Sequence, residues 1–435
     1  MSAATDTLVL RRRFVVLTFL RWFPTGLLIP ALVLLLTARG LSLQTVGVVF
    51  LAYGLTCVVL ELPTGGLADV IGRRVVLVAS GLLSVVSAVV LAFGQHVWVL
   101  MAGAVLAGVG RALDSGPLEA WYVDAARAVD DRCDLKPALS RAHAAGAVGL
   151  GLGSLGGGGL IALDALPETG RALLLNLSVP YLVSAVMGVV GVGFVQAWVH
   201  EPRTGPRPGV REITADVPRT VVRGSALVTR SRVLRRLSLR VVFVGVVLVT
   251  CELLSPLQFE QSIGADGYAV LATLAFLGAA AGARLAPALA HMVRGTGRGL
   301  VVATALTGVL MAGLTLPGWL LPAVAYVLLC VAIGLDDPLV GELLHDETSS
   351  SERATVLSVQ SLLGQGGGAA TNLAVPAIAA ATVFDVAWLA VGGIMLAASL
   401  LCVGLPRGHL GTADEDGGMA GDVGPIAEPL PTIAP

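Results

Sequence analysis

Charged side chains interrupt several long apolar stretches of this sequence, and they are the residues best placed to do chemistry. An ionisable group inside an apolar helix of membrane-spanning length costs about 2.5–3.5 kcal/mol on insertion scales, so each one is a functional candidate. A carboxylate in such a place can bind and release a proton, and a guanidinium can hold it in position. The candidates are Arg21, Arg111, Asp114, Glu119, Glu252, Asp336 and Asp337.

The composition is that of a helical membrane protein. The chain has 435 residues, of which 55% are hydrophobic and only 13% are charged, and its mean hydropathy is +0.85. Soluble domains carry about 25% charged residues, so this chain has about half the charge that a water-facing surface needs. The composition excludes soluble, disordered and coiled-coil proteins, and the long uninterrupted apolar runs exclude a strand-built barrel.

Twelve apolar runs have the length of about 20 residues that crosses a bilayer. We therefore predict an all-α integral membrane fold, with twelve transmembrane helices in two pseudo-symmetric six-helix bundles. The first run is expected to be a retained helix and not a signal peptide. The predicted parts are an N-terminal bundle at 1–198, a central loop at 199–238, a C-terminal bundle at 239–405 and an acidic, disordered tail at 406–435. The runs are 14–37, 43–63, 75–94, 98–123, 143–163, 177–198, 239–259, 267–289, 299–316, 319–341, 355–381 and 384–405.

The distribution of basic residues predicts the orientation in the membrane. Arg39 and Arg171 are the basic residues of the odd-numbered loops, whereas the other side has arginines at the N-terminus and throughout the central loop. Positive charge marks the cytoplasmic side, so we expect both termini in the cytoplasm of a multi-pass protein of the cell inner (plasma) membrane. These arginines are topology signals, and we expect no nucleic-acid partner. Residues 221–236 fit either an interfacial amphipathic helix or a solvated linker.

The buried charges recur with a period of three helices. They fall in predicted helices 1, 4, 7 and 10, which we expect to line a wet cavity, while helices 3, 6, 9 and 12 face lipid. Depth places Arg21 level with Asp114 and Glu119, and Arg111 lies three residues from Asp114 on one helix face. This cluster either exchanges a proton or only fixes helix packing, and the sequence leaves open which acid pairs with Arg21.

Glu252 has no cation at its depth in helix 7. Desolvation favours the neutral form of such a carboxyl group. Glu252 is then a proton carrier, a counter-charge for a cationic ligand, or a hydrated carboxylate that faces the cavity. Aromatic side chains and two further acids complete the substrate-cavity candidates, which are Trp22, Phe23, Trp121, Tyr122, Asp336 and Asp337.

The two halves show weak internal symmetry. Asp114 and Asp124 are separated by the same number of residues as Asp336 and Asp346. Helix 5 contains four consecutive glycines at 156–159, and helix 11 contains three at 366–368. These echoes indicate that the second bundle repeats the first.

The loop between helices 2 and 3 has a specific motif. Its glycines allow a tight turn, Asp69 can cap a helix N-terminus, and Arg73 offers a fork to a carboxylate. The motif reads Gly65-Gly-Leu67-Ala68-Asp69-Val-Ile-Gly72-Arg73-Arg74-Val-Val-Leu77.

This loop resembles the signature motif of the major facilitator superfamily, G-x-L-A-D-R-x-G-R-R-x-x-L, and departs from it at Val70. The resemblance implies a cytoplasmic gate in which Asp69 docks on the start of helix 11 and Arg73 pairs with Asp124. In the second half, Leu285-Ala286-Pro287 stands where the motif has Leu-Ala-Asp, so that copy is predicted to have decayed.

Two further patterns resemble motifs of the same superfamily. Arg111 is similar to a buried arginine implicated in proton coupling. Helix 5 resembles the antiporter motif G-x-x-x-G-P-x-x-G-G, with Ser154 at the proline position, which implies export; helix packing also needs small residues there. The matching glycines are Gly149, Gly153, Gly157 and Gly158.

The leading hypothesis is a proton-coupled antiporter of the multidrug-resistance type. We expect a monomer in the lipid bilayer that exports a small amphipathic drug or metabolite by alternating access, with the proton gradient as energy source and no cofactor. The alternative is a proton-coupled importer of a sugar or organic acid, although helices 1, 4, 7 and 10 have few amide side chains for a sugar. An enzyme is not expected, since the sequence has no metal-spaced His or Cys cluster and no phosphate-binding glycine loop.

Overall fold

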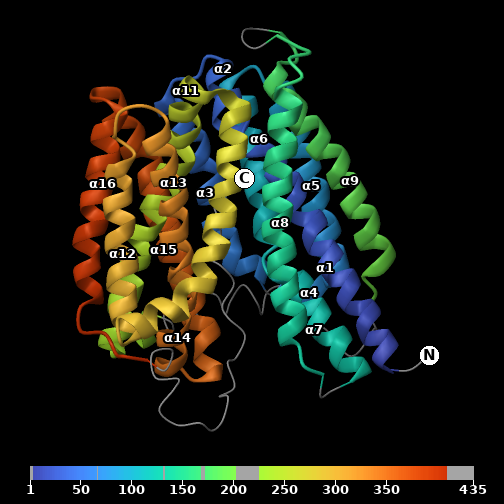
Figure 1. The fold of residues 1–435 in the computed structure, drawn as a ribbon. Coiled ribbons are helices and arrows are strands. Elements are labelled where there is room, and N and C mark those ends of the chain that lie inside the picture. The colour runs from blue at the N-terminus through green and yellow to red at the C-terminus, as the bar shows by residue number, and fades with distance from the viewer. Residues whose placement is uncertain (1–2, 66, 131–132, 168–171, 202–224, 409–435) are drawn as a thin grey trace. The chain divides into compact units, whose positions relative to one another are not determined.

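The computed structural model describes the chain except for residues 1–2, 66, 131–132, 168–171, 202–224 and 409–435 (Figure 1). Within the described residues the regular structure is helical and contains no strand. The chain divides into two compact units. The first unit comprises Met1–Val217 and Ala265–Thr273, and the second comprises Pro218–Gly264 and Leu274–Ala434. The predicted acidic tail from residue 409 and most of the predicted central loop lie outside the described residues.

The first unit is built from the N-terminal apolar runs, and several of its helices are interrupted. The first predicted span is divided into α1 and α2, with Pro30 in the turn between them, and the fourth into α6 and α7. The helices are α1 (Ala3–Leu28), α2 (Leu32–Ala38), α3 (Leu43–Gly65), α4 (Leu67–Ile71), α5 (Arg73–Phe93), α6 (Val97–Leu113), α7 (Pro117–Val129), α8 (Lys136–Ile161), η1 (Asn176–Ser178) and α9 (Val179–Trp198).

The second unit repeats this construction. Its fourth span is also interrupted, here between α13 and α14. Two predicted spans run together in α11, which leaves helical geometry only at Gly264 (φ 76°, ψ 168°). The helices are α11 (Arg232–Met292), α12 (Thr296–Gly313), α13 (Leu320–Gly334), α14 (Asp336–Glu347), α15 (Ser350–Ala381), α16 (Phe384–Ser399) and η2 (Leu400–Cys402).

The helices confirm the twelve predicted spans. Among the described residues, ten helical stretches are long and apolar enough to cross a membrane, and one of them, α11, contains two of the predicted spans. The remaining span is α15, a helix of 32 residues. Several helices begin before their predicted spans, since α1 begins at Ala3, α8 at Lys136, and α11 at Arg232, inside the predicted central loop. The helix extends through an arginine-rich segment that a hydropathy pattern assigns to a loop.

Both interrupted fourth spans place an aspartate at the interruption. In the first unit, Asp114 follows the last residue of α6, and Gly116 (φ 90°) and Pro117 restart the helix as α7. Glycine adopts this positive φ without strain, and proline is well suited to a first helical turn. In the second unit, Asp336 begins α14, and Pro338 lies in its first turn, where no backbone donor is needed.

Glycines allow the first and fifth spans of each unit to pack closely. In the first unit, α1 and α8 lie side by side, and a Cβ atom on Gly153 would lie 2.8 Å from the Cα of Gly26 (Figure 1). In the second unit, a Cβ atom on Gly245 of α11 would lie 2.9 Å from the main-chain carbon of Gly364 in α15. Backbones this close leave no room for a side chain.

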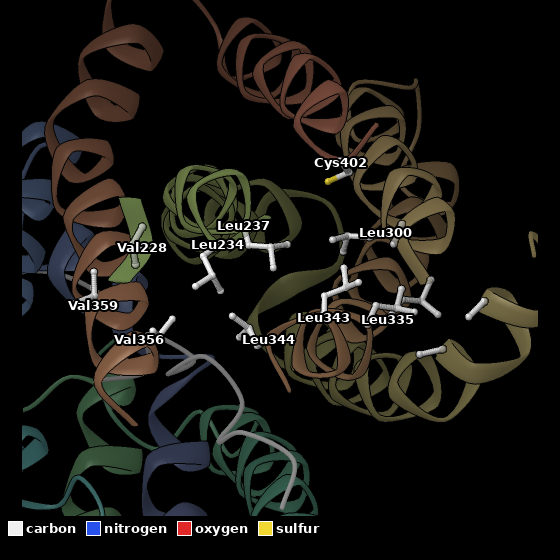
Figure 2. Close-up of a cluster of buried hydrophobic side chains, with 14 residues drawn as sticks. Val228, Leu234, Leu237, Leu300, Leu335, Leu343, Leu344, Val356, Val359 and Cys402 are labelled. Atoms are coloured by element: carbon white, nitrogen blue, oxygen red, sulfur yellow. The ribbon is translucent and has the colours of Figure 1, made fainter. Parts of the chain in front are cut away.

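Each unit has an apolar core near the end of its interrupted fourth span. In the second unit, Leu300, Leu335 and Leu343 are buried together with Val228 and Leu234 (Figure 2). Residues 225–230 are helical, and Val228 is the buried residue among them. Val228 packs into the core of the second unit, and the choice between an interfacial helix and a solvated linker stays open. Val221 and Val222 lie outside the described residues.

Candidate functional site

An ion pair joins the first and fourth spans of the first unit. Arg21 of α1 donates from Nε to Oδ2 of Asp114, and its Nη2 donates to the main-chain oxygen of Asp114 at 3.0 Å. The sequence left open whether Arg21 pairs with Asp114 or with Glu119, and in the structure it pairs with Asp114. One guanidinium serves both the carboxylate and an end carbonyl of α6, where the helix dipole favours a cation. The side chains are 20% and 16% exposed, so the pair is partly accessible.

Two guanidinium groups lie close to one tryptophan ring beside this pair. The Arg21 guanidinium lies 5.1 Å from the ring centre of Trp22, and that of Arg111 lies 5.6 Å from it. The indole is fixed against α8, since a Cβ atom on Gly146 would lie 2.9 Å from its Cδ1. The structure therefore brings Arg21, Arg111 and Asp114 together around one aromatic ring, as their depth predicted. Glu119 lies in the first turn of α7 and is partly buried.

Glu61 is a charged residue of this region that the sequence analysis missed. It is partly buried in α3, one turn after Cys57, whose thiol donates to the main-chain oxygen of Gly108 in α6 at 3.6 Å. Glu61 lies near the end of its apolar run, where a charge looks like part of the following loop. The structure places it on the helix that packs against α6.

A second ion pair occupies the corresponding place in the second unit. Arg240 of α11 donates from Nη2 to Oδ2 of Asp336, and its Nε donates to Thr304 at 2.8 Å. Here the side chains are only 3% and 6% exposed. Arg240 was missed because it lies at the edge of a predicted loop. A signal was present, since Arg21 and Asp114 are 93 residues apart and Arg240 and Asp336 are 96 apart.

The pairing of Asp336 bears on its predicted place in a substrate cavity. Its carboxylate forms an ion pair with Arg240 in the interior of the second unit. The other carboxylate oxygen, Oδ1, has no hydrogen-bond partner among the described residues. Asp337, the next residue, is partly exposed. The two aspartates therefore have different surroundings, and only Asp337 has access to water.

Glu252 lies in the first half of α11. The residue is partly exposed, but its Oε2 is buried and has no hydrogen-bond partner within the described part of the chain. One turn further, Ser255 lies 3.3 Å from the hydroxyl of Tyr326 in α13. The ring of Tyr326 lies 5.6 Å from that of Phe259, tilted by 52°.

The four aromatic cavity candidates fall into two groups. Trp121 and Tyr122 are 3% and 2% exposed, and they belong to the apolar core of the first unit. The Tyr122 ring stacks on Phe14 at 4.4 Å, and Trp121 donates to the main-chain oxygen of His200 at 3.2 Å. Trp22 and Phe23 are partly exposed. Hydropathy does not distinguish these two environments, because both kinds of side chain are apolar.

The loop motif forms the ion pair that its resemblance implied. Arg73 Nη1 lies 2.5 Å from Oδ2 of Asp124. Gly72 has a φ of 103° and precedes the first residue of α5, which requires glycine. Glu201 accepts from the backbone nitrogen of Arg74 at 2.9 Å and so caps this helix N-terminus. The surroundings of Gly65 and Asp69 lie outside the described part.

The second half keeps a counterpart of this turn at a different place from the predicted one. Gly295, with a φ of 143°, precedes α12 as Gly72 precedes α5. The next residue, Thr296, donates to Glu342 of α14 at 2.5 Å, where Arg73 pairs with Asp124 of α7. Leu285-Ala286-Pro287 lies within α11 and was the wrong register for the repeat.

The glycines of the antiporter-like pattern serve helix contacts. Gly149, Gly153 and Gly157 face α1, where a Cβ atom on each would meet backbone atoms. Gly158 faces Ala269 of the segment that belongs to the same unit, and Ser154 donates to the main-chain oxygen of Ala269 at 3.3 Å. Proline has no such donor. These contacts account for the small residues, and antiport remains a prediction of the resemblance.

Metal chemistry has no support in the described residues, which contain no group of three or more His, Cys, Asp or Glu side chains suited to hold an ion. What they do bring together is paired charge inside apolar helices. Such an arrangement can bind and release protons at a carboxylate that a guanidinium holds. It suits transport across a membrane.

Comparison with known proteins identifies the family. The chain resembles the nucleoside transporter NupG, with 12% identity, a TM-score of 0.71, and coverage of 90% of this chain and 98% of that one. It also resembles a POT family transporter solved with a thioalcohol-conjugated peptide, with 14% identity, a TM-score of 0.66, and coverage of 91% and 94%. No curated protein sequence matches. The sequence profile of the Major Facilitator Superfamily matches residues 14–371, and the chain therefore belongs to this superfamily.

Proposed function

We propose that this membrane transporter is a proton-coupled exporter of small amphipathic molecules, with the pair of Arg21 and Asp114 as its proton-coupling site. The observation that carries the proposal is the position of this pair. It joins α1 to the interruption between α6 and α7, and it is partly exposed. Interrupted membrane helices leave backbone groups and charges where a substrate or ion can act on them.

Proton binding at this site would change the contacts of the pair. A proton on Oδ2 of Asp114 turns the carboxylate into a neutral acid and removes the charge that holds the Arg21 guanidinium. Arg21 keeps its contact with the Trp22 ring and is free to move away from the helix interruption. Loss of the proton restores the pair, so the two protonation states favour two arrangements of α1 against α6 and α7.

The second ion pair is assigned a different role. Arg240 and Asp336 are almost completely buried, and Thr304 adds a hydrogen bond. A proton from water does not reach such a carboxylate without opening the unit. We assign this pair, together with the buried Trp121 and Tyr122, to holding the helices of their units in place.

Export is supported by the resemblance of α8 to the antiporter motif and by the small number of polar groups on the charged spans. The arginine distribution supports an inner-membrane protein with cytoplasmic termini. The likeness to a nucleoside transporter and a peptide-bound transporter rests on identities of 12% and 14%. Such identities show the fold and do not indicate the substrate. An importer of a small nutrient is the competing outcome of the test.

Inverted membrane vesicles from cells that make the protein provide the test. With an acidic interior, an exporter accumulates a fluorescent amphipathic dye such as ethidium, and an uncoupler abolishes the accumulation. Vesicles with Asp114→Asn should lose it, and vesicles with the exposed Asp164→Asn should keep it. Accumulation that is insensitive to the uncoupler would refute proton coupling. Proton-driven uptake of a sugar or organic acid in right-side-out vesicles, without dye export, would establish the importer.

A further inference from the structure

Glu252 differs from the other buried acid of the second unit. Both Glu252 and Asp336 bury one carboxylate oxygen that has no hydrogen-bond partner among the described residues. Asp336 has Arg240 beside it, whereas no described charged group acts on Glu252. A membrane-buried carboxylate without a partner is unfavourable, so its presence points to a group that occupies it during function.

The side chains along one face of α11 surround this carboxylate. Residues 252, 255 and 259 are spaced three and four apart, which places them on the same side of the helix. Ser255 donates to the main-chain oxygen of Cys251 at 2.6 Å, and Tyr326 of α13 lies across this face with its hydroxyl near Ser255. Phe259 is buried, and its ring packs against that of Tyr326. The face therefore offers an acceptor and a hydroxyl on a rigid wall.

The accessibility of Glu252 shows how a ligand can reach the site. The residue as a whole is partly exposed, while its Oε2 is buried. The exposed part of the side chain is where a ligand can meet the carboxylate. The missing interaction is a positive charge beside the carboxylate, and the neighbouring rings of Phe259 and Tyr326 supply aromatic surface. A small organic cation with an apolar body has this chemistry, and an anion or a neutral polyol does not.

We propose that Glu252 is the counter-charge for the cationic centre of the substrate, so that the exporter recognises lipophilic organic cations through α11 and α13. The inference rests on the proposed function for the statement that this ligand is a transported substrate. The proposal assigns the two transported charges to different sites. The proton binds at Asp114 in the first unit, and the cation binds at Glu252 in the second.

Binding measurements on the purified full-length protein test the proposal. The probes are radiolabelled tetraphenylphosphonium, a lipophilic cation, and chloramphenicol, a neutral amphipathic molecule. Glu252→Gln should weaken binding of the cation by about tenfold to a hundredfold, because the variant has no negative charge to attract it, and leave chloramphenicol unaffected. Glu260→Gln, on the exposed side of the same helix, should bind both probes as the wild type does. Unchanged binding of the cation by Glu252→Gln would overturn the proposal, as would a wild-type protein that does not bind it.

A second measurement uses the wild-type chain and does not depend on the folding of a variant. A hydrophobic carbodiimide modifies accessible carboxyl groups in membrane proteins, and mass spectrometry of the peptide that contains Glu252 reports the extent. Tetraphenylphosphonium should protect Glu252 from modification, and chloramphenicol should not. Equal modification with and without the cation would contradict the proposal.

These outcomes are distinct from those of the vesicle test. Binding in detergent needs no proton gradient. If the protein binds the cation through Glu252 but shows no gradient-driven export, the cation site stands and the proposed function is refuted. If the Glu252→Gln variant exports ethidium with full activity, the proposed function stands and the cation site is refuted.

Discussion

The guanidinium of Arg240 lies against the carboxylate of Asp336 in the interior of the second unit, where the two side chains are 3% and 6% exposed. The same pairing joins Arg21 and Asp114 in the first unit, with exposures of 20% and 16%. In both cases the arginine comes from the first span of the unit and the aspartate from the interruption of the fourth. The internal repeat has therefore kept the contact and changed its access to water, which gives the two pairs different expected properties.

Loss of one partner should destabilise the buried pair more than the exposed one. Asp336→Ala is expected to lower the free energy of unfolding by about 3–5 kcal/mol, because it leaves the Arg240 guanidinium buried and unpaired. Asp114→Ala should have a smaller effect, since water can hydrate Arg21. Thermal unfolding midpoints of the purified variants in one detergent measure the difference.

Replacing both members of the buried pair is the control for this prediction. The double variant Arg240→Met with Asp336→Leu removes both charges and should recover most of the lost stability. If Asp336→Ala unfolds at the wild-type temperature, the pair does not hold the second unit together. If the double variant is as unstable as the single one, the effect comes from lost packing and not from an unpaired charge.

Asp114→Asn should separate exchange from gradient-driven transport. Asparagine resembles the protonated acid in shape and carries no charge, so this variant is fixed near one of the two protonation states. We expect gradient-driven accumulation to fall to background, while exchange of labelled for unlabelled substrate across a vesicle membrane continues. Asp164→Asn is the matched control, because Asp164 is exposed and its positive φ of 44° is one that asparagine tolerates. Full gradient-driven activity of Asp114→Asn would remove Asp114 from the coupling mechanism.

Much of the architecture could be predicted from local patterns. The twelve spans follow from apolar runs of membrane length, and the pairing of Arg73 with Asp124 follows from a motif with fixed spacing. The depth argument also brought Arg21 to the level of Asp114. These predictions succeed because a membrane helix rises by a constant amount per residue, so position along the chain gives depth directly.

The errors have equally local causes. Arg232, Arg235 and Arg236 lie in the first turns of α11, and their charge hid the helix start and with it Arg240. Trp121 and Tyr122 were placed in a cavity because composition does not tell which face of a helix is packed. The surroundings of Glu252 depend on how α13 packs against α11 and on which carboxylate oxygen is buried. A single sequence does not contain that information.

The packing of α1 against α8 makes a prediction about two neighbouring glycines. A Cβ atom on Gly153 would lie 2.8 Å from the Cα of Gly26, and only a backbone shift can relieve that contact. Gly153→Ala should therefore lower the stability by about 1–3 kcal/mol, as overpacking does in other cores. Gly159→Ala is the control, since nothing lies within 4 Å of its Cβ position, and alanine favours the helix by about 1 kcal/mol. Equal unfolding midpoints for the two variants would show that α1 and α8 can separate without loss.

The last prediction concerns Arg39, which follows α2 and ties three segments of the first unit together. Its Nη1 donates to the main-chain oxygen of Ala172 at 2.5 Å, and its Nη2 donates to those of Leu173 at 3.0 Å and Ala92 at 3.1 Å. A lysine has the same charge but lacks the planar fork, so Arg39→Lys should leave carbonyls unpaired and lower the stability by about 1–3 kcal/mol. Amide hydrogen exchange of residues 172–178 should rise in this variant.

Arg298→Lys supplies the comparison for Arg39→Lys. Arg298 is exposed, and its Nη1 makes one long hydrogen bond of 3.5 Å to the main-chain oxygen of Val293. The same chemical change should therefore leave the unfolding midpoint and the exchange of residues 172–178 as they are in the wild type. If Arg39→Lys behaves like Arg298→Lys, charge alone is sufficient at position 39. A loss confined to Arg39→Lys would show that the fork geometry of arginine holds α2, the end of α5 and the segment before η1 together.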